Sequence, residues 1–186
     1  MKLPRVAWIT PTYKRPQHLP NLIACFLAQD YPRELLRLHI LDDANQYGRG
    51  CAGDRWRVTS YADRVHSLPA KFNWLCRIAR NADVIVVAED DDSFLPWHTL
   101  AHVTALQHGG GFSKPSRVFS DYPGHVVEEP AAGRFHGSIA LRRELWLRCG
   151  GWPDTQRADF DQHAMRVFET AAGGVCDPCE AFPPSY

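Results

Sequence analysis

Three short apolar segments, each followed at once by polar residues, mark the first half of the chain. They are residues 6–9, 38–41 and 84–88, and the last of them is a continuous apolar run. Runs of this kind are typical of strands that are covered on both faces of a sheet. Apolar residues at helical spacing over residues 17–29 and 71–80 predict a helix between each pair of strands. A strand–helix–strand series predicts that the three strands lie parallel in one sheet.

The rest of the chain predicts shorter elements and one long loop. Residues 44–61 hold glycines and arginines without a clear period, so we expect a loop there. The later pattern predicts helices at 96–107, 142–149 and 160–171, a hairpin of 117–120 with 125–128, a strand within 134–141, and an irregular tail at 176–186. The predicted class is therefore α/β: a Rossmann-type, mostly parallel sheet flanked by helices, with a small antiparallel hairpin.

Polar residues follow all three predicted strands. Thr10, Pro11 and Thr12 follow the first, Asp42 and Asp43 follow the second, and the run 89–92 (Glu-Asp-Asp-Asp) follows the third. Parallel strands bring their carboxyl ends to one edge, and open α/β sheets bind ligands at that edge. We therefore expect one site that combines hydroxyl and carboxylate groups.

The four consecutive carboxylates predict a bound cation. Two unit charges about 4 Å apart repel by ~1 kcal/mol in water and by ~4 kcal/mol at an effective dielectric constant near 20. Mg²⁺ or Mn²⁺ suits such an all-oxygen ligand set. The alternative is a solvated turn in which Asp92 or Ser93 caps the helix predicted at 96–107. The position directly after a buried strand favours the metal site.

Composition narrows the class of protein without naming a substrate. The 186 residues suit one domain, and the 21 basic and 21 acidic residues give no net charge, so the basic excess of a dedicated nucleic-acid binder is missing. The longest apolar run is far shorter than the roughly 20 residues that span a bilayer, and no signal peptide opens the chain, so we expect a cytoplasmic protein. Cys176 and Cys179 have the spacing of half a zinc site or a redox pair, against the alternative of unpaired thiols.

Several of these segments together resemble a known family, the GT-A-fold inverting glycosyltransferases of the family-two type. The resemblance runs from about residue 5 to residue 166, and its order and spacing are more specific than any one motif. It is carried by the segments Thr10–Pro16, Leu27–Pro32, Ile40–Asp43, Lys71–Asn73, Glu89–Asp92 with Pro96 (similar to the DxD motif), Gly150–Trp152 and Asp159–Asp161.

The resemblance implies a role for each matching residue. The nucleotide sugar, a UDP-sugar by family expectation, would contact Thr10, Pro11, Thr12, Arg15, Asp42 or Asp43, Lys71, Asn73, Asp90 and Trp152. The metal, Mn²⁺ or Mg²⁺, would be bound chiefly by Asp91, with Glu89 and His163 as further candidates. The general base would be Asp159 or Asp161. Residues 1–92 would form the nucleotide-binding half of a single domain, and residues 93–175 the acceptor side.

Each role has a plainer alternative. Asp159 could cap the last helix, Lys71 and Asn73 could begin a helix, Trp152 could be a core residue, and His163 could be an ordinary packed or surface histidine. A nucleotidyltransferase is the second candidate enzyme, although the turn after the first strand lacks that class's glycine-rich loop. A non-catalytic nucleotide-sugar or metal-binding module is the third reading. The acceptor stays open among a saccharide, a lipid carrier, a protein side chain and a hydroxylated base in nucleic acid.

Overall fold

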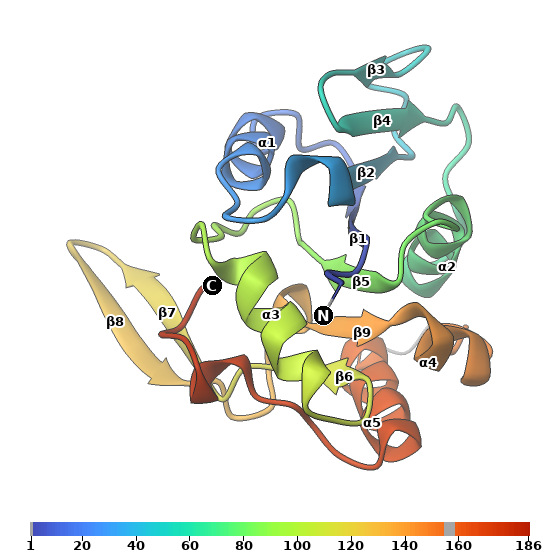
Figure 1. The fold of residues 1–186 in the computed structure, drawn as a ribbon. Coiled ribbons are helices and arrows are strands. Elements are labelled where there is room, and N and C mark those ends of the chain that lie inside the picture. The colour runs from blue at the N-terminus through green and yellow to red at the C-terminus, as the bar shows by residue number, and fades with distance from the viewer. Residues whose placement is uncertain (1, 155–158) are drawn as a thin grey trace.

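The fold is built on one mixed sheet with a separate hairpin. The structure is a computed structural model that describes residues 2–154 and 159–186. Within these residues the sheet has seven strands in the order β3-β4-β2-β1-β5-β9-β6, and β7 and β8 pair apart from it (Figure 1). The strands are β1 Val6–Thr12, β2 Leu36–Asp42, β3 Cys51–Ala52, β4 Trp56–Ser60, β5 Val84–Val87, β6 Phe112–Ser113, β7 Arg117–Tyr122, β8 His125–Pro130 and β9 Ala140–Arg142.

The three predicted apolar strands are parallel neighbours at the centre of the sheet, as expected. β1 pairs with β2 on one side and with β5 on the other. Thr12 lies opposite Asp42 in the register, so the polar ends of β1 and β2 meet at one edge. This register confirms the predicted convergence of strand ends.

The predicted long loop at 44–61 is wrong in its second half. β4 pairs in parallel with β2, and β3 adds an antiparallel edge strand to β4. β4 was missed because only Val58 among its residues is fully buried, so its sequence shows no apolar run. Pairing with β2, rather than local pattern, gives this segment its extended form.

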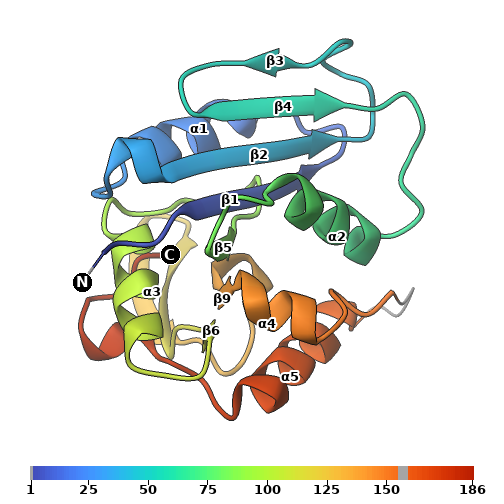
Figure 2. The ribbon, with the colours of Figure 1, turned by 45° about the vertical axis from the view of Figure 1, so that its right-hand side comes forward.

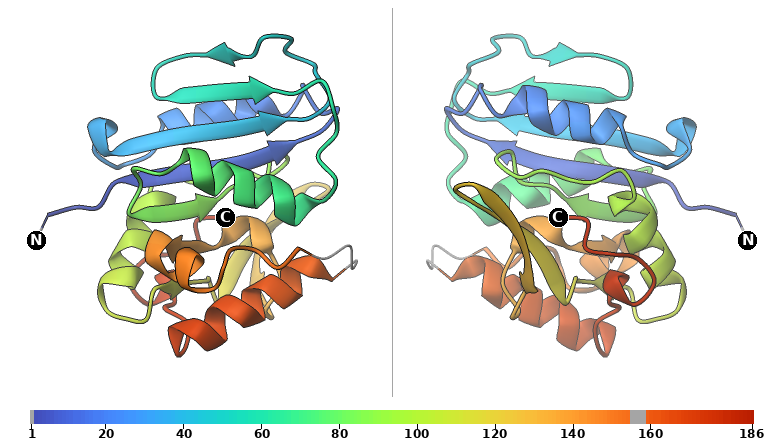
Figure 3. Two further views of the ribbon diagram at one scale, coloured as in Figure 1. Left: turned by 90° about the vertical axis from the view of Figure 1, so that its right-hand side faces the viewer. Right: turned by 90° about the vertical axis from the view of Figure 1, so that its left-hand side faces the viewer.

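Helices cover both faces of the sheet, which explains the continuous apolar strands. Alternate residues of β1 point to opposite sides: Val6 and Trp8 pack in one hydrophobic cluster, Ala7 and Ile9 in the other. The first cluster includes residues of α1 and α3, and the second includes residues of α2, α4 and α5. Figures 2 and 3 show these two helical layers on opposite sides of the central strands.

The helices begin and end close to their predicted positions. They are α1 Leu19–Leu27, α2 Leu68–Ile78, α3 His98–Gln107, α4 Arg143–Arg148 and α5 Phe160–Ala172. α2 begins three residues before the predicted start because Ser67 caps it, accepting a hydrogen bond from the Ala70 N–H at 3.1 Å. Lys71 therefore lies inside the first turns of the helix and does not begin it.

The second half of the chain closes the sheet on the side of β5. β9 is antiparallel to β5, and β6 is antiparallel to β9. The strand expected within 134–141 is shorter than predicted, because residues His136–Ser138 form the 3₁₀ helix η2 instead. The tail contains a further 3₁₀ turn, η3 Pro178–Glu180, and its last residue lies beside β7, where the Phe119 N–H donates to the Tyr186 carbonyl at 2.7 Å.

Two further expectations concern the cysteines and the membrane. Cys176 and Cys179 are both free thiols. None of the helices in the described part of the chain is both long enough and apolar enough to cross a bilayer.

Candidate active site

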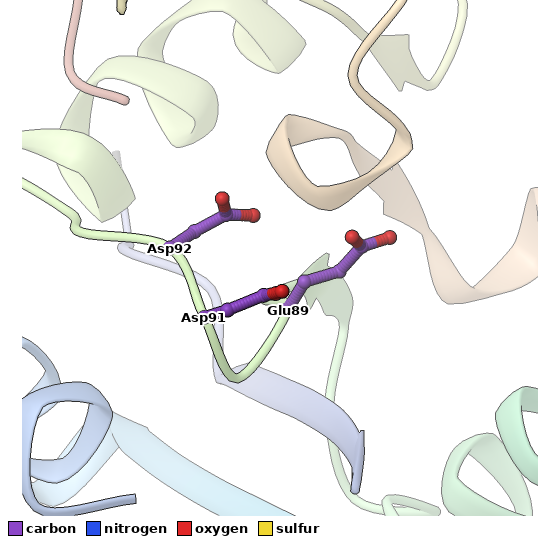
Figure 4. A group of neighbouring side chains, drawn as sticks. All are labelled: Glu89, Asp91 and Asp92. Carbon is purple, nitrogen blue, oxygen red and sulfur yellow. The ribbon is translucent and has the colours of Figure 1, made fainter. Parts of the chain in front are cut away.

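Three carboxyl groups gather on the loop that follows β5, which we call the acidic loop (residues 89–92). One oxygen from each of Glu89, Asp91 and Asp92 lies within 4.8 Å of the other two. Figure 4 shows the three side chains extending to the same side of the loop. A set of three carboxylate oxygens at this spacing fits a hard divalent cation such as Mg²⁺ or Mn²⁺. The sequence named Glu89 and Asp91 as candidate ligands, and the structure places Asp92 beside them.

Asp90, the fourth carboxylate, turns the other way and binds protein groups. It is buried, and it accepts hydrogen bonds from Thr12 Oγ1 at 2.5 Å and from Arg15 Nη1 at 3.2 Å. Arg15 Nη1 also donates to Asp91 Oδ2 at 2.8 Å. The charges of Asp91 and then Asp90 raise the pKa of the Arg15 guanidinium. Arg15 thus offsets part of the negative charge of the acidic loop.

Asp92 is partly buried, and this alters its acidity. Burial raises the pKa of its carboxyl group to about 7, a hydrogen bond from Tyr186 Oη at 2.9 Å partly opposes this, and the charge of Glu89 adds to it. The alternative interpretation, in which Asp92 or Ser93 caps the next helix, is wrong. α3 begins at His98, its cap residue is Trp97, and no side chain caps it. A cation is the group that would favour the charged form of Asp92.

Two ring nitrogens lie in line behind Glu89, and the nearer of them, His136 Nδ1, is buried without a hydrogen-bond partner among the described residues. The Trp152 indole N–H donates to His136 Nε2 at 3.0 Å. Because an indole nitrogen can only donate, Nε2 must be the unprotonated nitrogen, and a neutral ring then carries its proton on Nδ1. His136 Nδ1 lies 3.5 Å from Glu89 Oε1. Trp152 and His136 therefore direct a donor toward one of the clustered carboxylates.

Trp152 is buried in the core, which argues against its predicted role in sugar binding. Its side chain is 1% exposed and stacks on Phe72, with ring centroids 5.3 Å apart. The plainer alternative, a core residue, is the one that the structure supports.

A cavity of about 450 Å³ opens beside the acidic loop. This volume lies within the range of about 300–1,000 Å³ that is typical of small-molecule sites. The predicted residues that line it are Pro11, Thr12, Arg15, Lys71, Glu89, Asp90 and Asp91, and Tyr13, Arg64 and His66 join them. The cavity therefore brings three basic side chains together with three carboxylates of the acidic loop.

The two aspartates at the end of β2 are not part of the wall of this cavity. Both oxygens of Asp42 are used inside the fold, accepting from Ser60 Oγ at 2.5 Å and from the backbone N–H groups of Ala44, Gln46 and Tyr47. Asp43 accepts from Lys71 Nζ at 2.6 Å and from the Val65 N–H at 3.0 Å. The structure thus gives Asp42 a turn-forming role, and Asp43 an ion pair with a lysine that does line the cavity.

Thr10 and Asn73 are likewise structural, which corrects their predicted contacts with the nucleotide sugar. Thr10 is fully buried and donates to the Ala88 carbonyl at 2.7 Å. Asn73 Oδ1 accepts from the Trp146 indole at 3.1 Å and from the Trp152 N–H at 2.8 Å, while its amide donates to the Trp152 carbonyl at 2.9 Å. Asn73 therefore ties α2 to the turn at residues 150–152.

The candidate bases lie at the start of α5. Asp159 is the cap residue of this helix, but its side chain makes no capping hydrogen bond, and its Oδ2 lies 3.9 Å from Arg166 Nη2. Asp161 follows in the first turn. Phe160 packs against His136, with ring centroids 5.8 Å apart, which brings the start of α5 near Glu89. The segment 155–158, just before it, lies outside the described residues.

His163 is not placed with the clustered carboxylates. It lies one turn into α5, where its backbone N–H donates to the Asp159 carbonyl at 3.0 Å. Among the residues that the structure describes, the only group of three or more ligand-type side chains within 4.8 Å is Glu89, Asp91 and Asp92. The prediction of His163 as a metal ligand is therefore wrong for this arrangement.

Comparison with solved structures shows which known fold the chain has. The chain is similar to the mannosyltransferase PcManGT from Pyrobaculum calidifontis in complex with GDP-Man and Mn²⁺, at a TM-score of 0.69 and 20% identity over 99% of this chain and 56% of that one. It is also similar to S. aureus TarS 1–349 in complex with UDP, at a TM-score of 0.72 and 12% identity over 92% of this chain and 56% of that one. The chain has a GT-A-like glycosyltransferase fold.

The sequence itself gives no further match. No protein-family model and no curated protein matches it. The chain spans a little over half the length of each of these two solved chains. The likeness therefore establishes the fold, and the chemistry must be argued from the residues of the site.

Several residues of this candidate site could not be found from the sequence. Asp92 belongs to the acidic run, but the sequence suggested a helix cap for it, so it was not named among the candidate metal ligands. Tyr13, Arg64 and His66 lie in segments without periodicity, and only the fold shows that they line the cavity. Arg64 stacks over the Tyr13 ring at 4.1 Å, which joins the turn after β1 to the segment before α2.

Proposed function

We propose that this protein is a metal-dependent glycosyltransferase that moves a sugar from a nucleoside-diphosphate sugar to an acceptor hydroxyl with inversion. The main observation behind the proposal is that a cavity lined by three basic side chains lies next to the clustered carboxylates of Glu89, Asp91 and Asp92. The ligands named for similar folds support it: GDP-Man with Mn²⁺ for PcManGT, and UDP or UDP-GlcNAc for TarS.

The donor would lie in the 450 Å³ cavity, with its diphosphate toward the acidic loop. Pro11 and Thr12 would contact the nucleoside, and Arg15 and Lys71 would approach the diphosphate. Mn²⁺ or Mg²⁺, held by Glu89, Asp91 and Asp92, would stabilise the negative charge of the leaving diphosphate. The family expectation for the base is uracil, so UDP-sugars are the first donors to test.

The acceptor hydroxyl needs a base on the side opposite the leaving group. Asp159 is our candidate, with Asp161 as the alternative. In the transfer step the acceptor oxygen bonds to the anomeric carbon, the bond from that carbon to the diphosphate oxygen breaks, and the hydroxyl proton passes to the carboxylate. One displacement of this kind inverts the anomeric configuration.

The test has a binding arm and a turnover arm. We expect UDP-sugars or GDP-sugars to stabilise the protein only with Mn²⁺ or Mg²⁺, by about 2.7 kcal/mol at a hundredfold excess over the dissociation constant. We also expect slow release of the nucleoside diphosphate to water. Asp91→Ala should abolish the metal-dependent stabilisation. Asp159→Asn should leave it intact and stop transfer, while Asp30→Asn, an exposed position on another part of the surface, should change neither.

Other outcomes would favour the competing functions. Pyrophosphate release from a nucleoside triphosphate and a sugar phosphate would favour a nucleotidyltransferase. Metal-dependent binding without any release, even with acceptors present, would favour a non-catalytic module. Transfer that persists in Asp159→Asn would move the base assignment to Asp161.

A further inference from the structure

A second cavity lies on the other side of the acidic loop. It has a volume of about 870 Å³, and Asp91 belongs to the walls of both cavities. Its other walls come from Asp92, the β7–β8 hairpin, Phe135 and Tyr186. Figure 1 shows the hairpin projecting beside the C-terminus, away from β3 and β4. The clustered carboxylates therefore separate two spaces, each large enough for a small molecule.

The two cavities differ in charge. Arg15, Arg64 and Lys71 line the first, where they face the carboxylates of the acidic loop. Arg134 is the one basic residue among the described residues that line the second, and its guanidinium lies 3.8 Å from Glu129 Oε1. The second cavity also holds the carboxylates of Asp91, Asp92 and Asp121. Acidic and basic side chains are balanced in the first cavity, whereas acidic ones outnumber basic ones in the second, so a phosphorylated ligand is more strongly disfavoured in the second.

The second cavity also presents aromatic rings beside hydrogen-bond acceptors. Phe119, Tyr122, Phe135 and Tyr186 contribute to its walls, and the Tyr122 side chain at the tip of β7 is 44% exposed. Glu129 accepts hydrogen bonds from Ser120 Oγ at 2.5 Å and from Tyr122 Oη at 3.5 Å, so it holds both side chains on one face of the hairpin. An exposed ring offers an apolar face, and a carboxylate is a strong acceptor for hydroxyl groups.

We propose that this second cavity binds the acceptor, and that the acceptor is an uncharged saccharide. The inference rests on the proposed function and deepens it. Tyr122 stacks on the apolar face of the sugar ring, Glu129 and Asp121 accept hydrogen bonds from its hydroxyl groups, and Asp91 marks the passage to the donor. The carboxylates of this cavity disfavour a lipid phosphate or a nucleic acid in the same place.

A panel of acceptors tests the charge preference. With the donor that the thermal-shift assay selects, nucleoside diphosphate release is measured with neutral p-nitrophenyl hexosides, with hexose 6-phosphates, with farnesyl phosphate, with a serine-rich peptide and with a DNA duplex that carries a hydroxymethylated base. We expect at least one neutral hexoside to raise release above the acceptor-free rate, and the phosphorylated compounds and DNA to leave it unchanged. Faster release with a phosphorylated compound, with the peptide or with DNA than with every hexoside would overturn the proposal.

Two variants test the residues. Tyr122→Ala should raise KM for the hexoside about tenfold, and Glu129→Gln should raise it in the same direction, with KM for the donor unchanged. Leu147→Ala, which alters an exposed apolar side chain on α4, is the matched control and should change neither constant. Unchanged KM values for the hexoside in both variants would contradict the assignment. If the donor neither binds nor releases its nucleotide, the proposed function fails instead, and the acceptor-free measurements show this separately.

Discussion

The buried ion pair between Lys71 and Asp43 should contribute strongly to the stability of the fold next to the cavity, and this contribution can be measured. Lys71 Nζ lies 2.6 Å from Asp43 Oδ1, and the two side chains are 7% and 0% exposed. Lys71→Met keeps most of the aliphatic stem and removes the ammonium. Asp43 would then be a buried carboxylate with one remaining donor, the Val65 N–H. Removing one partner of a buried pair costs about 3–5 kcal/mol, because the remaining charge is uncompensated.

A double variant separates this cost from lost packing. Lys71→Met with Asp43→Asn carries no buried charge, so we expect it to be more stable than Lys71→Met alone. Urea unfolding at pH 7 gives the free energy of unfolding of each variant. The urea midpoints of the variants are compared with that of the wild type, with the same dependence of free energy on urea concentration for all of them. The single variant should also lower Tm by about 6–20 °C, at roughly 2–4 °C per kcal/mol for a chain of this size.

Two results would refute this reasoning. One is a loss of less than about 1 kcal/mol in Lys71→Met, which would mean that the pair is well solvated. The other is a double variant whose loss equals the sum of the two single losses, which would mean that the two side chains do not interact.

Three further predictions concern buried groups elsewhere. Burial lowers the pKa of His102 to about 4 and that of His98 well below its usual value, so the unfolded state binds more protons below pH 6.5. The free energy of unfolding should therefore fall from pH 6.5 to 4, by up to about 1.4 kcal/mol per pH unit per histidine. In His102→Gln, the free energy of unfolding measured with urea should depend less steeply on pH than in the wild type. Gly151→Ala should cost about 1–3 kcal/mol in a thermal melt, because φ is +98° at this glycine and an added Cβ would meet Asn73 Oδ1; an unchanged Tm would show that the turn is not strained. Trp152→Phe keeps a ring in the core but removes the N–H that donates to His136. The affinity for Mn²⁺, measured by calorimetry, should then fall about tenfold, while far-UV circular dichroism stays the same. Equal affinities in the variant and the wild type would show that Trp152 does not position His136 for metal binding.

The central strands and the convergence of their ends could be predicted because they depend on local pattern. Continuous apolar runs such as residues 84–88 arise where both faces of a strand are covered, and the chirality of strand–helix–strand units then fixes the parallel order. β4 could not be predicted in this way. Its extended form depends on pairing with β2, whose partner residues lie about twenty positions earlier in the chain.

The site was predicted less completely than the fold, because the sequence shows where a polar residue stands but not which way it points. Asp42 and Asp90 both follow apolar strands, yet Asp42 folds its own turn while Asp90 lines the cavity. Asn73 and Trp152 belong to motifs of the resembling family, but in this fold they bond to each other. Such assignments need the tertiary contacts of residues about eighty positions apart.

Manganese binding followed by electron paramagnetic resonance tests the central claim most directly, because free Mn²⁺ gives a signal that is lost on binding. If Glu89, Asp91 and Asp92 hold a cation that a diphosphate shares, wild-type protein should bind one Mn²⁺, and UDP or GDP should tighten this binding. Asp91→Asn should weaken binding by about tenfold or more and remove the effect of the nucleotide. Equal Mn²⁺ affinity in the variant, or an affinity in the wild type that neither nucleotide alters, would contradict the account.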